Sequence, residues 1–205
     1  NFQNRFNPAV QQLLKYLETG QLGKIELCSI DVRWWRNDEY FKDWHGNPRR
    51  VGGMLFNQGA HSLDLMLQIC GPVKKITKLT KSLRKFTKVD DIYLALLQFQ
   101  NGTVGRIEVT TYTKSRNCEA SLFVVGEKGS IKLGGPSFNK LEFKSLKNDA
   151  INGQAVNDSL TEVEDSHFKL IKTLNTYLLD GKKSKFLASA EDGISVTEFI
   201  EKLYR

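Results

Sequence analysis

The sequence has 205 residues, of which 40% are hydrophobic and 26% are charged, a composition typical of a water-soluble globular protein with a substantial core. No apolar run approaches the roughly 18 residues that span a bilayer, and no charged-then-apolar leader opens the chain, so we expect a cytoplasmic protein without membrane contact. Cys28, Cys70 and Cys118 lie too far apart for a disulfide framework or a zinc site, so we expect reduced thiols in or near the core and no bound metal.

Much of the net charge of +7 lies in one basic stretch, which contains Lys74, Lys75, Lys78, Lys81, Arg84, Lys85 and Lys88. One interpretation is a solvated strand face, because exposed lysines discourage edge-to-edge pairing of sheets. The other is a nucleic-acid contact. Phe86 is the one aromatic residue in the stretch, so a platform for stacking bases is not supported and we expect no nucleic-acid partner.

The first elements are a helix, a strand and a loop. Asn7 is a capping residue type, Pro8 suits the first helical position, and apolar residues then recur at helical spacing until Gly20 supplies a stop. Alternating side chains predict a strand over residues 24–35. Residues 36–51 are polar and aromatic without a period, which predicts a loop.

A second helix is expected over residues 53–69, and β-strand patterns follow it at 73–84, 91–99, 103–113, 119–126, 129–133 and 139–145. Asn101-Gly102 is a strong hairpin signal, and strands joined by such short turns must be antiparallel. Two helices close the chain. One follows a capping box at Thr161 and Glu164 and carries a stripe of Leu170, Leu174 and Leu178, whereas the other begins near Ser189 with Val196, Phe199, Ile200 and Leu203 directed inward.

This order of elements predicts an α+β domain: a large, mostly antiparallel or mixed open sheet with helices on one face. Residues 91–99 are apolar on both sides of the expected strand. We therefore expect the other sheet face to be buried against a second copy of the chain, in a homodimer or homotetramer.

The residues with the clearest chemical potential lie at the start of the second helix. Asn57 and His61 are four residues apart and share a helix face, and Asp64 follows one turn later, with Gln58 beside them. Nearby glycines leave the helix start open to a ligand. A single helical histidine is more often structural than catalytic, and the polar neighbours are what make His61 a candidate. His45, in a loop, and His167, on a helix surface, lack such neighbours and are expected to be structural.

The pattern around His61 resembles the Gfo/Idh/MocA oxidoreductase family, whose C-terminal domain carries G-G-x-x-x-(D/N)-x-G-x-H-x-x-D, here residues 52–64. Further matches cover essentially the whole chain: residues 4–8, 20–25, 90–105 and 125–131. The resemblance implies an N-terminal Rossmann domain that binds NAD or NADP and supplies a lysine. Residues 1–205 would be the substrate-binding and oligomerisation domain alone, because no Gly-x-Gly-x-x-Gly motif occurs in them.

The same resemblance assigns roles to individual residues. His61 becomes the acid/base or hydroxyl-positioning residue, for which an imidazole is suited. The family usually has Asp where this chain has Asn57; an amide cannot accept a proton at neutral pH, so Asn57 is expected to position substrate or His61. The local string is most similar to the branch that oxidises C3 of UDP-N-acetylglucosamine-type uronates for surface polysaccharides (lipopolysaccharide). For such a substrate we expect binding by Gln58, Asp64, Arg36, Tyr40 and Arg49, the arginines neutralising diphosphate and carboxylate.

Two functions of different classes follow. The first is the sugar-binding part of an NAD(P)-dependent sugar dehydrogenase, with the chain inactive by itself because hydride chemistry belongs to the nicotinamide. The alternative is a non-enzymatic binding or dimerisation module of the same fold. The coding sequence upstream of Asn1 distinguishes them: a Gly-x-Gly-x-x-Gly motif there favours the enzyme, and a start codon favours the module.

Overall fold

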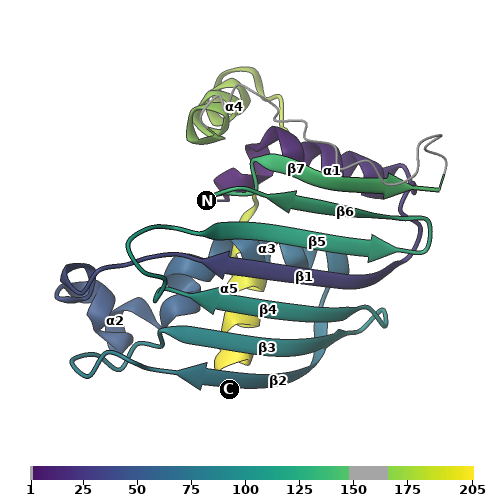
Figure 1. Cartoon of the computed structure of the whole chain (residues 1–205). Helices are drawn as coiled ribbons and strands as arrows, with labels where there is room; N and C mark the ends of the chain where they lie inside the picture. The colour runs from purple at the N-terminus through teal and green to yellow at the C-terminus, as the bar shows by residue number, and fades with distance from the viewer. Residues whose placement is uncertain (1, 148–165) are drawn as a thin grey trace.

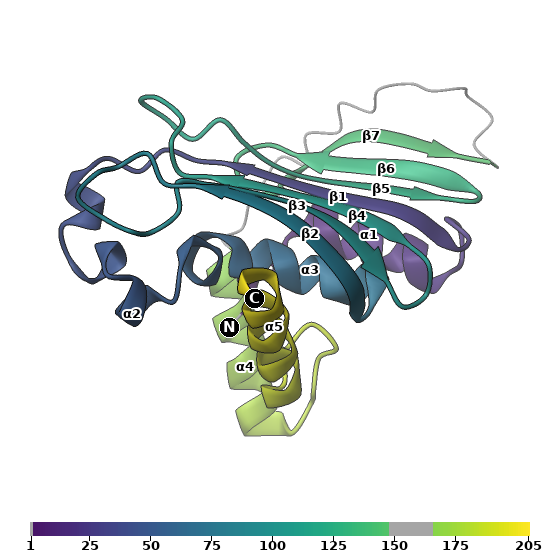
Figure 2. The ribbon, with the colours of Figure 1, turned by 90° about the horizontal axis from the view of Figure 1, so that it is seen from below.

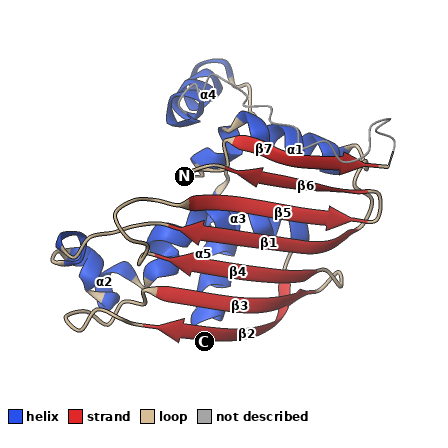
Figure 3. Ribbon diagram, in the orientation of Figure 1, coloured by secondary structure: helices blue, strands red, loops and turns tan. Residues whose placement is uncertain are grey.

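A computed structural model describes residues 2–147 and 166–205, which form one open sheet with helices against one face (Figure 1). The strands are β1 (Ile25–Arg33), β2 (Val73–Lys81), β3 (Ile92–Phe99), β4 (Val104–Thr110), β5 (Glu119–Gly126), β6 (Gly129–Gly134) and β7 (Lys140–Leu146). They lie in the order β2-β3-β4-β1-β5-β6-β7 (Figure 3). All neighbouring pairs are antiparallel except β1 and β4, which are parallel. The predicted α+β fold with a mixed sheet is confirmed.

The longer helices lie on one side of the sheet (Figure 2). They are α1 (Pro8–Glu18), α3 (Ala60–Cys70), α4 (Ser166–Asp180) and α5 (Ala190–Tyr204), and a 3-10 turn, η1 (Gln3–Phe6), precedes α1. The expected cap is present at Asn7, whose side chain accepts a hydrogen bond from Ala9 N. The last helix begins after Ser189 as predicted, and Ser189 forms a capping box with Asp192. The predicted capping box, at Thr161 and Glu164, lies outside the described residues.

The core fills the space between the sheet and α1, α3 and α5. Alternate residues of β1, β3 and β4 are buried against the helices, as the period of two in their sequence requires. Val196, Phe199, Ile200 and Leu203 of α5 are buried as predicted. The stripe predicted for α4 is not: Leu170 is buried, but Leu174 and Leu178 are exposed, because α4 projects away from the sheet (Figure 2).

The opposite sheet face is open in the single chain and carries two kinds of surface. Ion pairs cover β1, β4 and β5, where Arg33 contacts Glu108 and Glu119, both at 2.5 Å. Beyond them, Leu94 and Leu96 of β3 are exposed. No helix in the described part of the chain has the length and hydropathy to cross a membrane.

The basic stretch lies on and after β2, an edge strand. Its lysines are exposed, apart from the partly buried Lys78, as expected for a solvated edge, but Arg84 is buried. Cys28 and Cys70 are buried free thiols, and the hydrogen bond between them, together with burial, raises the pKa of Cys28. Cys118 is exposed, so the expectation of core thiols holds for two of the three cysteines.

Candidate functional site

Several of the predicted site residues lie near the edge of the sheet where β1 and β4 end, since parallel strands place their carboxyl ends at one edge. The loop that follows β1 contains three short helices, η2 (Glu39–Phe41), η3 (Trp44–Gly46) and α2 (Pro48–Val51), where the sequence predicted an irregular loop. Asn47 caps α2 through Arg49 N, and Gly52 ends it with a left-handed φ of 73°. The loop leads directly into the helix that carries His61 (Figure 1).

The helix starts with a π-turn, η4 (Leu55–Gly59), which continues into α3. Gly53 precedes it with a φ of 110°, and an added Cβ would lie 2.5 Å from the ring of Tyr204. Tyr204 Oη in turn accepts a hydrogen bond of 3.1 Å from Leu55 N. The last helix, α5, therefore fixes the start of the site helix, and glycine is required at position 53 by both conformation and contact.

Tyr40 joins the loop to the site helix. Its hydroxyl oxygen accepts hydrogen bonds from Asn57 Nδ2 at 2.7 Å and from Gln58 Nε2 at 2.8 Å. A phenol oxygen that accepts two hydrogen bonds still has its own hydrogen to donate. The structure thus brings together Tyr40, Asn57 and Gln58, three of the residues expected to bind or position substrate.

His61 lies one turn further along the helix and is mostly buried. Phe2 packs edge-on against its ring, with 6.1 Å between the ring centroids. Burial is the largest cause that lowers the pKa of His61 below its ordinary value of 6.5, and the nearby charge of His167 contributes less. The imidazole is therefore neutral at neutral pH, with one nitrogen able to accept a proton.

Two polar atoms of this group are buried and have no hydrogen-bond partner within the described residues: Nδ1 of His61 and Oε1 of Gln58. A buried polar atom left unpaired costs about 1–3 kcal/mol, so such atoms are rare except where a ligand or water completes them. The arrangement can therefore bind a polar ligand that offers both a donor and an acceptor. We name Tyr40, Asn57, Gln58 and His61 the amide–imidazole cluster.

Aromatic and basic side chains flank the cluster on the loop. The ring of His45 lies 4.1 Å from that of Tyr40 and stacks on Trp44 at 3.8 Å. The Arg36 guanidinium lies 5.5 Å from the Tyr40 ring centroid. His45 was expected to be structural, and it does form an ion pair with Asp43. Its ring, however, packs against Tyr40 of the cluster. The sequence pattern could not predict this contact, because the contact depends on how η2 and η3 fold.

Arg84 is a residue of this region that the sequence did not reveal. It is buried, forms a bifurcated ion pair with Asp91 and Asp38, and donates to the backbone oxygen of Arg36 at 2.5 Å. Its guanidinium also lies 4.3 Å from the ring of Phe41. Arg84 thus holds both ends of the Arg36–Phe41 segment that presents Tyr40. Because Arg84 lies among exposed lysines in the sequence, the sequence pattern predicted a solvent-exposed charge at this position.

Two of the expected substrate-binding residues lie apart from the cluster. Asp64 is buried, and both of its carboxylate oxygens accept hydrogen bonds from Arg5, at 2.8 and 2.5 Å. Its pKa is raised, with burial as the largest cause, and Arg5 opposes that rise. Arg49 is exposed on α2. The geometry therefore favours a structural role for Asp64 and leaves Arg49 as a solvent-facing charge beside the site.

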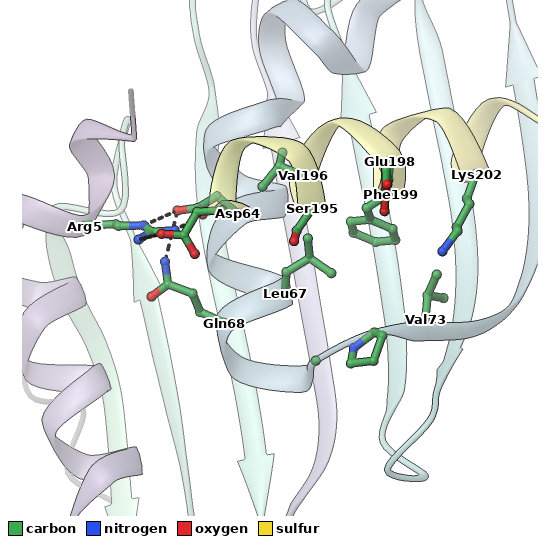
Figure 4. A pocket seen from close by; sticks show the side chains of 13 residues that line it. Arg5, Asp64, Leu67, Gln68, Val73, Ser195, Val196, Glu198, Phe199 and Lys202 are labelled. Atoms are coloured by element: carbon green, nitrogen blue, oxygen red, sulfur yellow. Dashed lines mark hydrogen bonds and ion pairs between the residues drawn. The ribbon is translucent and has the colours of Figure 1, made fainter. Parts of the chain in front are cut away.

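Asp64 also borders a cavity of about 390 Å³ between α3 and α5, shown in Figure 4. At one end of the cavity, Arg5 donates to Asp192 at 3.0 Å as well as to Asp64. None of the cluster residues lines this cavity. These contacts of Arg5 with Asp64 and Asp192 join η1, α3 and α5. Within residues 2–147 and 166–205, no three His, Cys, Asp or Glu side chains gather as a metal site.

Comparisons with known proteins give the family and the fold to which the chain is similar. Over the whole chain, the fold is similar to the WlbA dehydrogenase of Bordetella pertussis in complex with NADH and UDP-GlcNAcA, at 26% identity and a TM-score of 0.83. The chain covers 100% of its own length in that likeness and 59% of the WlbA chain. The corresponding enzyme of Chromobacterium violaceum, at 24% identity and a TM-score of 0.84, has the same fold over 58% of its chain.

A curated relative is the D-apiose dehydrogenase of Rhizobium rhizogenes, 27% identical over 63% of this chain and 38% of the relative. The chain thus spans well under two thirds of the proteins it resembles. The family model described as the GFO/IDH/MocA C-terminal domain matches residues 10–132, which include the loop, the cluster and strands β1 to β6 up to Lys132. The chain belongs to the GFO/IDH/MocA family of oxidoreductases and carries its C-terminal domain.

Proposed function

We propose that this chain is the substrate-binding part of an NAD(P)-dependent dehydrogenase that oxidises a hydroxyl of a nucleotide sugar. The observation that carries the proposal is the amide–imidazole cluster, in which His61, whose pKa is lowered, and Gln58 each have a buried polar atom without a hydrogen-bond partner among the described residues. Family membership supports oxidoreductase chemistry at this position. Neither polar atom is needed to hold the fold together, since neither has a partner among the described residues.

His61 is the base in this proposal. Its neutral imidazole accepts the proton of the sugar hydroxyl as the C–O single bond becomes a carbonyl. A bound nicotinamide would supply the acceptor for the hydride from the same carbon. Asn57 cannot take a proton, so it holds Tyr40, and Tyr40 donates its remaining hydrogen to an oxygen of the substrate.

The substrate class follows from the surroundings of the cluster. Arg36, Arg49 and Arg50 place positive charge on the loop, which suits a diphosphate and a carboxylate. Trp44 is partly exposed and His45 stacks on it, which gives a flat aromatic wall beside the cluster. The likeness to a WlbA dehydrogenase in complex with NADH and UDP-GlcNAcA supports a UDP-linked uronate as the substrate. A role in surface-polysaccharide synthesis is part of the proposal and rests on the resemblance of the sequence alone.

The nicotinamide would be held by a domain outside this chain. No two of the chain's glycines are separated by a single residue, so a Gly-x-Gly-x-x-Gly loop cannot form from it. We therefore propose an N-terminal dinucleotide-binding domain and an inactive isolated chain. The exposed Leu94 and Leu96 on the open sheet face support an assembly of two or four copies through that face.

The test uses the longer protein encoded by the gene. With NAD⁺ or NADP⁺ and UDP-GlcNAcA it should produce nicotinamide absorbance, and His61→Asn should lower kcat at least a hundredfold while cofactor binding is unchanged. Lys140→Asn, an exposed change on β7, is the control and should leave kcat within twofold. Unchanged turnover in His61→Asn would exclude His61 as the base, and a gene that begins at Asn1 would favour the non-enzymatic module.

A further inference from the structure

Helix α4 presents most of its apolar side chains to solvent. Phe168, Ile171, Leu178 and Leu179 are 56%, 63%, 71% and 76% exposed, and they recur at the spacing of one helix face. The opposite face, which is turned toward the rest of the domain, contains Leu170 and the hydroxyls of Thr173 and Thr176. Those hydroxyls bond back to carbonyls of their own helix, so they are not held by the domain.

Helix α5, which has the same length as α4, shows how an apolar helix face is buried when it has a packing partner. α5 also has 15 residues, and its Val196, Phe199, Ile200 and Leu203 are all buried against the sheet and α3. In α4 one apolar residue, Leu170, is buried. A contiguous exposed apolar face of this kind marks an interaction surface in soluble proteins. We call Phe168, Ile171, Leu174, Leu178 and Leu179 the α4 face.

The position of α4 restricts what can cover this face. α4 packs against η1, the first described element, and Figure 1 shows the start of the chain beside it. Phe2, just before η1, contacts the ring of His61. His167 lies in the first turn of α4, and a positive charge on it contributes to the lowered pKa of His61. The start of the chain, α4 and the proposed base therefore lie on one side of the domain.

We infer that the α4 face is the docking surface for the dinucleotide-binding domain of the same protein. The inference rests on the proposed function, since a domain that delivers a nicotinamide to His61 must approach this side. That domain would join the chain at η1, directly beside α4. The WlbA dehydrogenase that binds NADH is matched over 59% of its length, which leaves room for a domain of the required size.

This docking also gives a reason for the arrangement of α4 itself. Its domain-facing side buries one apolar side chain, Leu170, whereas its outward side exposes five, the reverse of a helix that stabilises only its own domain. Covering the α4 face would fix the helix and hold His167 near His61. The contact would couple closure of the two domains to the site.

The experiment measures thiol labelling of Leu178→Cys in a background where the exposed Cys118 is replaced by Ser. Asp180→Cys is the matched control, because Asp180 is exposed and lies about half a turn away around the same helix. We expect Leu178→Cys to react at least tenfold more slowly in the longer protein than in the 205-residue chain, and Asp180→Cys to react equally in both.

Equal labelling of Leu178→Cys in both proteins would overturn the inference. Slow labelling of Leu178→Cys in the 205-residue chain, becoming slower as the protein concentration rises, would also overturn the inference, because a second copy would then cover the α4 face. Slow labelling in that chain at every concentration would overturn it as well, because residues 148–165 would then be the occupant. NADH binding by the longer protein, followed by its fluorescence, is measured in parallel. A protein that binds NADH but fails to oxidise sugars contradicts the proposed function, whereas labelling tests the docking separately.

Discussion

Arg84→Met should destabilise the chain strongly, although Arg84 belongs to a stretch of surface lysines. Asp91 is fully buried, and the guanidinium of Arg84 is its ion-pair partner. Without that partner, the carboxylate keeps, among the residues that the structure describes, the backbone donors Leu83 N at 2.5 Å and Arg84 N at 2.9 Å. Removing one member of a buried ion pair costs about 3–5 kcal/mol, because the other charge stays buried and uncompensated.

The assay is urea unfolding, followed by circular dichroism, with Lys85→Met as the control. Lys85 is exposed, so its replacement should change the free energy of unfolding by no more than about 0.5 kcal/mol. Arg84→Lys should restore part of the loss, since an ammonium keeps the charge but not the planar fork that also reaches Asp38 and the Arg36 carbonyl. A loss below about 1 kcal/mol in Arg84→Met would refute the claim that Arg84 holds the loop.

Three further changes test other parts of the structure. Gly53→Ala should lower the free energy of unfolding, measured in urea, by more than about 2 kcal/mol, because the new Cβ would contact Tyr204 and φ at this position is positive. A change below about 0.5 kcal/mol would mean that Tyr204 can move aside without cost. Asn7→Ala should cost about 1 kcal/mol by removing the cap of α1, and Asn7→Ser should recover most of it. Burial lowers the pKa of His61 in the folded chain, so the unfolded chain binds the proton more tightly. The free energy of unfolding should therefore decrease as the pH falls below 6.5 and through the folded pKa, and His61→Asn should show a shallower decrease in acid. An NMR titration of His61 in the folded chain should give a midpoint below 6.5.

The sequence predicted most of the fold because local patterns and packing agree. The strand from 25 to 33 alternates as a half-buried strand must, and Asn7 and Ser189 cap helices where their residue types indicate. Hairpin turns required antiparallel neighbours. The parallel pairing of β1 with β4 joins strands distant in the chain, so no local signal specified it.

The site was predicted where its residues share one helix and missed where they do not. Asn57, Gln58 and His61 are neighbours in sequence, whereas the contact of Tyr40 with both amides depends on three short helices folded onto the sheet end. Asp64 has the spacing of a site residue, but Arg5, 59 positions earlier, takes both of its oxygens. Arg84 and the outward apolar side of α4 likewise depend on tertiary contacts that composition cannot reveal.

The central claim, that the amide–imidazole cluster receives the sugar, is tested most directly by NMR of the longer protein with UDP-GlcNAcA. Nuclear Overhauser effects between the sugar-ring protons and the ring protons of Tyr40 and His61 are the predicted result. Binding of the nucleotide sugar without any such effect at either ring would contradict the account.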